Sequence, residues 1–186
     1  MDPTQIINEL YGDSPAGRLV ASHGRQVADK ALAVAGRVPH LAPDLTFIET
    51  AALLHDIGIR WTRAPELDCN GTEPYICHGV RGREYLEQIG LARYGLVCER
   101  HVGVGIAAAD IRQHRMPLPV RDMIPETVEE EIICFADKFF SKNGGQLSDE
   151  KPVSQILVGL ARYGRDRVER FCDWAERFRE PLNGVR

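Results

Sequence analysis

Six side chains, by their types and their order, make a metal site the first chemistry to consider in this chain. They are His23, His55, Asp56, His78, His101 and Asp137. Imidazole nitrogens and carboxylate oxygens are ligands that zinc, iron, manganese, cobalt and nickel take in proteins. A set that contains one adjacent pair also suits two ions that share a bridging carboxylate. Because it directly follows a histidine, Asp56 is the expected bridge.

The apolar surroundings of these groups argue for a shared role. His23 lies between Val20 and Val27 in a helical apolar stripe, and Asp137 lies in the apolar run 132–140. An ionised carboxylate in such a place needs a cation or a full set of hydrogen-bond donors. Considered one at a time, each histidine could instead be a neutral residue of the core, and Asp137 could instead form a salt bridge. A metal site accounts for all of them together.

Helices must position these ligands, because the hydrophobic period is helical nearly throughout. Ser14 is the expected N-cap of the first helix, and Asp44 caps a second helix that Gly58 ends. Thr127 caps a later helix that Asn143-Gly144-Gly145 stops. The expected helices cover residues 15–36, 45–57, 78–88, a segment ending at 101, 106–113, 128–140, 152–163 and 165–180.

No stretch shows convincing strand alternation, so the predicted fold class is all-α. Residues 60–76 contain prolines and an Asn-Gly pair and show no clean period. We expect them to form a long loop between two ligand-bearing helices, and such loops are often lids or binding loops.

Length and composition predict one domain over residues 1–186, with a C-terminal helical extension over 152–180. A formal net charge of −4 gives no electrostatic footprint for nucleic acid or for an anionic membrane, so neither is expected as a partner. The first residues show no secretory signal, and no run approaches the roughly 20 apolar residues of a membrane span. We therefore expect a cytoplasmic protein.

The five cysteines form no CxxC pair, so reduced and mostly buried thiols are expected. Cys77 and Cys98 each lie near a ligand histidine, which leaves a thiolate zinc site as an alternative without the paired spacing of a zinc module. His40 lies in a proline-rich loop and His114 in a polar stretch, so neither joins the ligand set.

The segment Leu53-Leu54-His55-Asp56-Ile57-Gly58 resembles the HDIG signature of the HD-domain superfamily of metal-dependent phosphohydrolases. All six candidate ligands follow the H…HD…H…H…D order of its dinuclear branch. The chain is also similar to the small HDIG-containing subgroup, and the resemblance covers about residues 16–142. It implies a single HD domain with a helical core of about six to seven helices.

The resemblance also implies roles for the ligands. In single-metal relatives the ion is held at the positions of His23, His55, Asp56 and Asp137, and the positions of His78 and His101 face the phosphate. In dinuclear relatives all six are ligands, which is the arrangement that we expect here. One or two divalent transition metals (Fe, Mn, Co, Ni or Zn) are the expected cofactors, and two are preferred. The expected catalytic residues are Asp56, His78 and His101.

One departure concerns the substrate. Many relatives carry a lysine immediately after HDIG that contacts phosphate, whereas this chain has Ile59 and then Arg60. Arg60, Arg63, Arg81 and Lys138 are the candidates for the missing positive charge. Each of these side chains could instead be solvated. The absence of the lysine after HDIG therefore leaves the substrate pocket open, while the metal ligands are unaffected.

The expected reaction is hydrolysis of a phosphoester or phosphoanhydride of a small phosphorylated substrate by a metal-activated hydroxide. A nucleotide is the expected substrate. Two alternatives stay open. Some proteins with the same ligand order are mixed-valent diiron oxygenases that cleave C–C or C–P bonds with O₂. A non-catalytic nucleotide-binding module is the other alternative, although an intact ligand set argues against it.

Overall fold

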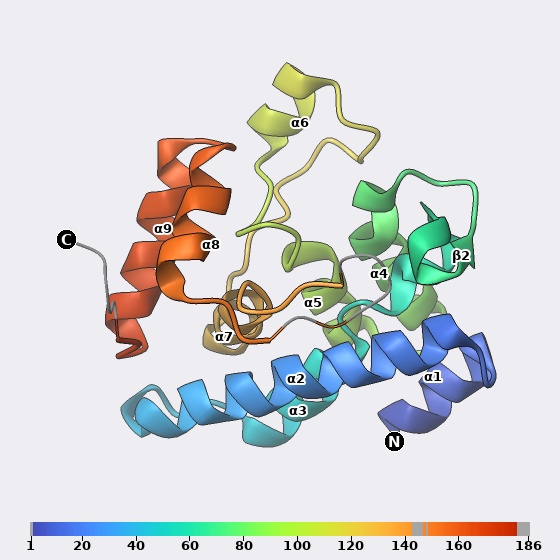
Figure 1. Ribbon diagram of the computed structural model, residues 1–186, viewed down its shortest axis with the longest axis horizontal. Helices are drawn as coiled ribbons and strands as arrows, with labels where there is room; N and C mark the ends of the chain where they lie inside the picture. The colour runs from blue at the N-terminus through green and yellow to red at the C-terminus, as the bar shows by residue number, and fades with distance from the viewer. Residues whose placement is uncertain (1, 143–146, 148, 182–186) are drawn as a thin grey trace.

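The computed structural model describes residues 2–142, 147 and 149–181 of the chain, and these residues are mostly helical (Figure 1). In chain order the described α-helices are α1 Pro3–Tyr11, α2 Pro15–Arg37, α3 Leu45–Leu54, α4 His78–Gln88, α5 Ala92–Arg100, α6 Ala108–His114, α7 Val128–Asp137, α8 Val153–Ala161 and α9 Arg165–Arg177. The predicted all-α class is confirmed. Within the described ranges, no helix combines the length and apolar character that a membrane crossing needs.

The segment between α3 and α4 differs from the plain loop that the sequence predicts. It contains 3-10 helices and a small antiparallel hairpin, in the order η2 Ile57–Trp61, β1 Arg63–Ala64, η3 Pro65–Leu67, β2 Cys69–Asn70 and η4 Tyr75–Cys77. A further 3-10 helix, η1 Pro39–Leu41, precedes α3. Strands of two residues are too short to show the alternation by which strands are recognised in a sequence.

Six of the predicted helices begin within one residue of their predicted starts, namely α2, α3, α4, α7, α8 and α9. The helix α1 is not predicted by the sequence, and α6 begins two residues later than predicted. Of the six, α3, α7, α8 and α9 end earlier than predicted. The side chains of Ser14, Asp44 and Thr127 each accept a hydrogen bond from a backbone N–H in the first turn, so the predicted N-caps are confirmed. The helix α3 ends at residue 54 and α7 at residue 137, each about three residues before the predicted end. The predicted stop at 143–145 lies outside the described residues.

Gly58 does not end α3, and its role is close packing. A Cβ at this position would overlap the carbonyl oxygen of His78 and the backbone nitrogen of Gly82. Glycine is therefore required because α4 crosses directly over η2. The contact holds the turn that contains the HD pair against the start of the next ligand-bearing helix.

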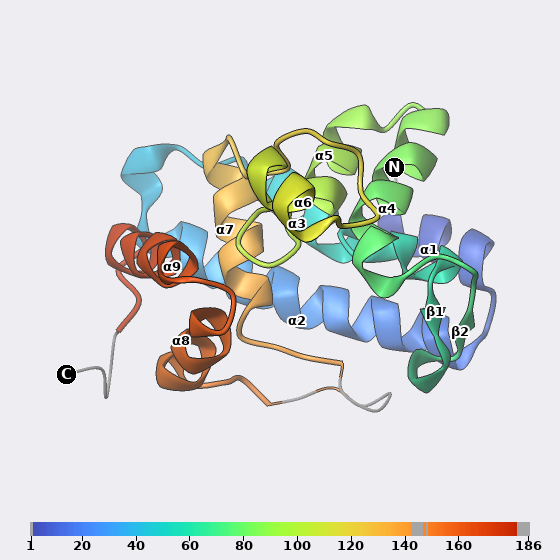
Figure 2. The same cartoon turned by 90° about the horizontal axis from the view of Figure 1, so that it is seen from above.

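Three apolar clusters hold the helices together. The first joins α2, α3 and α7 to α8 and α9 and includes Phe47, Ile132, Phe135, Phe171 and Phe178. The second joins α1, the start of α2, η2, α4 and α5 and includes Ile7, Tyr11, Val20, Leu54 and Ile57. The third joins the start of α4 to α6 and the segment after it and includes Cys77, Val80, Ile111 and Met123. In Figures 1 and 2, α8 and α9 lie at one end of α2, and α1 and the hairpin lie at the other.

Candidate metal centre

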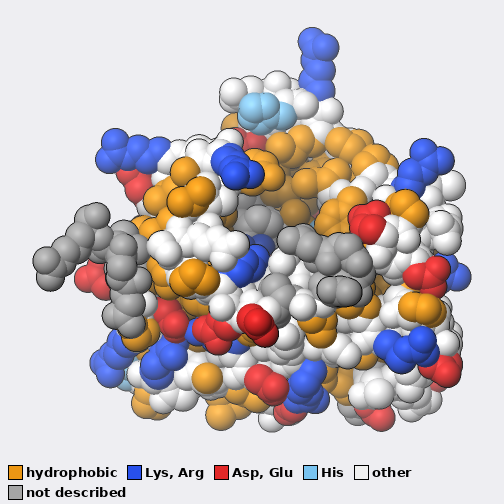
Figure 3. Space-filling model, viewed as in Figure 1, with side chains coloured by type: hydrophobic (Ala, Val, Ile, Leu, Met, Phe, Trp, Pro, Cys, Tyr) orange, Lys and Arg blue, Asp and Glu red, His pale blue; other side chains and the backbone are white. Residues whose placement is uncertain are grey.

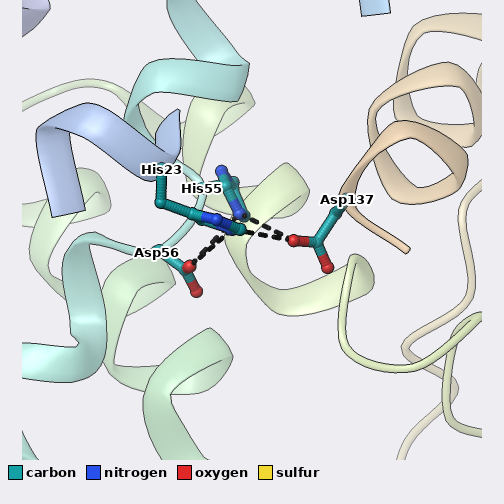
Figure 4. Close-up of side chains that lie close together, drawn as sticks. All are labelled: His23, His55, Asp56 and Asp137. Atoms are coloured by element: carbon teal, nitrogen blue, oxygen red, sulfur yellow. Dashed lines mark hydrogen bonds and ion pairs between the residues drawn. The ribbon is translucent and has the colours of Figure 1, made fainter. Parts of the chain in front are cut away.

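The six predicted ligands converge from five places in the fold. His23 comes from the middle of α2, His55 and Asp56 from the turn after α3, His78 from the start of α4, His101 from the residue after α5, and Asp137 from the end of α7. Five of these side chains are buried, and that of Asp137 is 12% exposed. Figure 4 shows Asp137 approaching the other drawn ligands from the opposite side.

These polar groups lie where the apolar clusters meet. His23 lies between Val20 of the second cluster and Val27 of the first. His55 directly follows Leu54 of the second cluster. Buried polar atoms in such a place must be satisfied by one another or by a bound group.

Asp56 presents one carboxylate oxygen to each of two ligand groups. Its Oδ2 lies 3.4 Å from Nε2 of His23 and 3.3 Å from Nε2 of His55. Its Oδ1 lies 3.4 Å from Nε2 of His78 and 3.5 Å from Nε2 of His101. Asp137 completes the first group, because its Oδ1 lies 2.9 Å from His23 Nε2 and 3.4 Å from His55 Nε2. Within each group the candidate ligand atoms lie within 4.8 Å of one another.

Backbone carbonyls hold a proton on Nδ1 of three imidazoles. Each donates its Nδ1–H to the carbonyl oxygen three residues earlier, at 2.6 Å in His55, 2.7 Å in His78 and 2.7 Å in His101. A neutral imidazole that donates from Nδ1 carries a lone pair on Nε2. The Nε2 atoms of His78 and His101 lie 3.2 Å apart, so two lone pairs face each other. A cation between them would relieve this contact, and carbonyl-bound Nδ1 atoms are the usual support of metal-binding histidines.

Two further nitrogens lack hydrogen bonds. Nδ1 of His23 and Nε2 of His55 are buried and have no hydrogen-bond partner among the described residues. For Nδ1 of His23, being unsatisfied in a buried position costs about 1–3 kcal/mol. The Nε2 of His55 is also the atom that faces the carboxylates of Asp56 and Asp137. Histidine nitrogens and carboxylate oxygens in this arrangement fit divalent transition metals.

Lysines balance the charge of the two buried carboxylates. Burial favours the neutral acid and by itself would raise the pKa of both. In Asp56 the ammonium of Lys142, together with His55, outweighs burial and holds the pKa well below its usual range. In Asp137 the ammonium of Lys138 does so together with the neighbouring histidines. Both carboxylates are therefore ionised and available as ligands.

The histidines divide by protonation. Burial lowers the pKa of His23 and of His101, and it lowers that of His78 to about 4. Burial also acts to lower the pKa of His55, but the carboxylates of Asp56 and Asp137 outweigh it and raise that pKa to about 9. The cluster therefore attracts positive charge to the position of His55 Nε2, where a metal ion would supply it.

The arginines that the sequence offered for substrate binding lie away from the cluster. Arg60 and Arg81 line a different pocket, of about 560 Å³, where Arg81 pairs with two glutamates. Arg63 is exposed on β1. Lys138, the fourth candidate, does lie at the site, because its Nζ is 2.8 Å from Asp137 Oδ2.

The sequence reasoning missed two lysines at the site. A pocket of about 400 Å³ opens beside Asp137, and Lys142 and Lys151 line it together with Lys138 and Tyr75. Both missed lysines lie between α7 and α8, where no hydrophobic period marks a functional face. Composition could have identified these two lysines. The chain has 4 lysines against 19 arginines, and three of the lysines follow Asp137 closely in sequence.

The residues left out of the ligand set do lie outside it. His40 and His114 are exposed, and all five cysteines are free. The thiols of Cys77 and Cys98 donate to backbone carbonyl oxygens at 3.2 and 3.3 Å. The structure therefore does not support the thiolate zinc alternative at these positions.

Comparison with curated proteins finds relatives that are longer than this chain. A protein of Picrophilus torridus named tRNA (cytidine(56)-2′-O)-methyltransferase is 32% identical over 141 residues, which are 75% of this chain and 36% of that protein. A protein of the same name from Thermoplasma volcanium is 29% identical over 141 residues, or 75% of this chain and 37% of that protein. An uncharacterised protein of Methanocaldococcus jannaschii is 35% identical over 95 residues, or 50% of this chain and 48% of that protein.

The chain thus spans about a third to a half of the length of these relatives. No solved structure gives a significant match. A family model described as HD domain matches residues 20–141. That stretch begins within α2, ends just after α7 and contains the whole ligand cluster. The chain therefore belongs to the HD-domain family.

Proposed function

We propose that this chain is a metal-dependent phosphohydrolase that cleaves a phosphoester or a phosphoanhydride. The observation that carries the proposal is the arrangement around Asp56, whose two carboxylate oxygens face separate pairs of histidines. Membership of the HD-domain family supports it. The same arrangement favours two divalent transition ions (Fe, Mn, Co, Ni or Zn) over one, and Asp56 would contribute ligand atoms to both.

The chain supplies ligands in two sets. His23, His55, Asp56 and Asp137 would hold one ion, and Asp56, His78 and His101 the other. Such ions, when bound, lower the pKa of water and polarise phosphoryl oxygens, which favours in-line attack on phosphorus. The carbonyl acceptors hold the protons of His55, His78 and His101 on Nδ1, so that each Nε2 stays directed at the cluster. The surrounding apolar side chains exclude water, which strengthens the electrostatic interactions within the cluster.

An adjoining apolar pocket supports a nucleotide as the substrate. Ile76 and Val102, which lie close in sequence to His78 and His101, line this pocket of about 510 Å³. Figure 3 shows a hollow lined by hydrophobic side chains between α6 and α8. Tyr163, another lining residue, is 79% exposed and could stack on a flat ring. Small-molecule sites have this size and this mainly apolar lining, so the pocket suits the base of a nucleotide.

The names of two relatives extend the substrate candidates to nucleotides derived from RNA. Both names state an action on tRNA, and this chain matches little more than a third of each protein. The net charge of −4 favours a small nucleotide over a polynucleotide. The proposed substrates therefore include nucleoside monophosphates and cyclic phosphates as well as nucleoside triphosphates.

The test is phosphate release from such a nucleotide panel. Protein stripped of metal with a chelator is reloaded separately with Mn²⁺, Fe²⁺, Co²⁺, Ni²⁺ and Zn²⁺. We expect metal-dependent hydrolysis of at least one nucleotide and its loss in Asp56→Asn. The matched control Asp173→Asn removes the same charge from an exposed position on α9 and should hydrolyse as the wild type does.

Two results would contradict the proposal. One is no hydrolysis of any nucleotide by protein that is fully loaded with metal. The other is oxygen consumption by the iron-loaded protein on an organic substrate without phosphatase activity, which would identify the oxygenase alternative instead.

A further inference from the structure

The pocket beside Asp137 gathers most of the lysines of the chain. Lys138, Lys142 and Lys151 line it, and Lys30 is the fourth lysine of the chain against 19 arginines. Lysine differs from arginine in carrying a compact point charge on a flexible stem, which can change its partner. This concentration of ammonium groups marks the pocket as a site for an anion.

The backbone explains why the three lysines meet. Lys138 and Lys142 follow the last residue of α7, and Lys151 precedes α8. The backbone N–H of Lys151 donates to the carbonyl oxygen of Phe139 at 2.8 Å, so the chain that enters α8 returns beside the end of α7. Partial burial lowers the pKa of Lys151, the carboxylate of Asp137 acts to raise it, and repulsion from Lys138 and Lys142 acts to lower it. Because all three side chains line the same pocket, their charges lie in one region of the surface.

The three lysines differ in their partners. The Nζ of Lys142 donates to Asp56 Oδ2 at 2.5 Å, and its side chain is only 10% exposed. The Nζ of Lys138 lies 2.8 Å from Asp137 Oδ2. Among the described residues, Lys151 has no carboxylate partner in an ion pair. One ammonium is thus available to an anion, and the other two are held by carboxylates.

Lys142 binds the same oxygen that a metal ion would need. Asp56 Oδ2 is the atom that faces His23 and His55 in the first ligand group. Lys138 is different, because it pairs with Oδ2 of Asp137 whereas Oδ1 of that residue faces the histidines. A divalent ion in the first group would therefore compete with Lys142 and leave the Lys138 pair in place. A divalent ion carries twice the charge of the ammonium group, so it is attracted more strongly to this carboxylate oxygen.

We propose that Lys142 exchanges Asp56 for a phosphate group when a divalent ion binds the first ligand group, and that Lys142 and Lys151 then hold that phosphate in the pocket beside Asp137. This inference rests on the proposed function, because it assumes a metal at Asp56 and a phosphorylated substrate. Phosphate would then bind weakly before the metal and more tightly after it, so that binding of the metal first is favoured.

The first test measures the binding of inorganic phosphate by calorimetry, with the full chain stripped of metal or loaded with Mn²⁺. We expect Mn²⁺ to strengthen phosphate binding to the wild type by at least about tenfold, because charge-assisted hydrogen bonds are the strong ones. Lys142→Gln and Lys151→Gln should each lose about tenfold of the metal-loaded affinity. The control Arg165→Gln removes the same charge from a side chain that is 91% exposed on α9 and should bind as the wild type does.

The second test measures Mn²⁺ affinity without phosphate, which does not depend on activity. Lys142→Gln removes the competitor for Asp56 and should bind Mn²⁺ several times more tightly than the wild type. Lys151→Gln should not, because Lys151 pairs with no described carboxylate. Unchanged or weaker Mn²⁺ binding by Lys142→Gln would overturn the exchange. Unchanged phosphate affinity in Lys151→Gln, which keeps the Lys142–Asp56 pair, would overturn the phosphate site even if Lys142→Gln fails to fold.

The outcomes separate this inference from the proposed function. Nucleotide hydrolysis by the wild type, combined with normal phosphate binding by both lysine variants, would overturn the lysine site and leave the function in place. Phosphate binding that requires both Mn²⁺ and the lysines, without hydrolysis of any nucleotide, would support the lysine site and overturn the function.

Discussion

The ends of helices orient the ligands. The last four carbonyl oxygens of a helix have no partner within it. His55 and His101 each directly follow a helix and donate Nδ1–H to one of these carbonyls, on Ala52 and Cys98. The helix end thus presents the ligand and also fixes which nitrogen of its ring carries the proton. The end of α3, which lies earlier than the sequence predicts, is part of the site for this reason.

Removal of His101 tests the division into two ligand groups. Because His101 belongs only to the group with Asp56 and His78, His101→Ala should lower the metal content from about two ions per chain to about one. The measurement is elemental analysis after metal loading and desalting. His114→Ala, which removes an exposed histidine on α6, is the control and should keep both ions. Retention of two ions by His101→Ala would show that His101 is not a ligand.

Much of the candidate site could be predicted from the sequence. The apolar period alone places His23 and Asp137 inward, and the order of the six residues supplies the rest. The positive charges could not be placed in this way. Lys142 lies after a helix end, where the sequence has no period, and its proximity to Asp56 depends on how the chain leaves α7. Tertiary packing, and not local pattern, decides which cation reaches the site.

At the scale of elements, the close crossing of η2 and α4 holds together the turns that carry the ligands. A substitution at Gly58 tests this packing. Gly58→Ala should destabilise the protein by about 3 kcal/mol or more, because the added methyl overlaps the backbone of α4. Gly36→Ala is the matched control near the end of α2, where a Cβ meets nothing within 4 Å, and it should stabilise by up to about 1 kcal/mol. Urea denaturation measures both changes. Equal stability of the two variants would contradict the packing argument.

The helix α1 supports the same turn from the other side. The hydroxyl of Tyr11 donates to the carbonyl oxygen of Ile57 at 2.9 Å in a buried position. Tyr11→Phe leaves that carbonyl without its donor and should cost about 1–2 kcal/mol of unfolding free energy. Urea denaturation again gives the value, and Tyr163→Phe, which removes an exposed hydroxyl, should be neutral. An unchanged free energy of unfolding in Tyr11→Phe would show that this hydrogen bond does not stabilise the fold.

The helices could be predicted where an apolar stripe and an N-cap coincide, as at Ser14, Asp44 and Thr127. The hairpin of β1 and β2 and the helix α1 could not. Short elements gain most of their stability from tertiary contacts and little from their own residues. Both pack into the second apolar cluster, through Ala64 and Cys69 of the hairpin and Ile7 of α1.

At the scale of the whole molecule, the proposed metal centre joins parts of the fold that also meet through the apolar clusters and through ion pairs such as Arg100–Glu130. Its ligands come from α2, α4, α7 and the residues that follow α3 and α5. Metal binding should therefore stabilise the whole fold. At a free metal concentration of about 100 times the Kd, the gain for one site is about 2.7 kcal/mol, which corresponds to a Tm increase of roughly 5–10 °C for a chain of this size.

Thermal unfolding with a chelator and then with Mn²⁺ checks this prediction. The Tm should rise with Mn²⁺ concentration in the wild type and much less in Asp137→Asn, which weakens the first ligand group. Asp173→Asn is the matched control and should respond as the wild type does. A Tm that does not respond to Mn²⁺ would contradict a metal centre built into the core.

The central claim is that the six side chains bind divalent metal, and the metal content of the protein tests it most directly. Chelated wild-type protein is reloaded with Mn²⁺, desalted and analysed for metal per chain, beside Asp56→Asn. Because Asp56 belongs to both ligand groups, the account predicts about two ions per wild-type chain and a loss of most of the metal in the variant. A wild-type chain that retains no metal, or an Asp56→Asn variant that retains as much as the wild type, would contradict it.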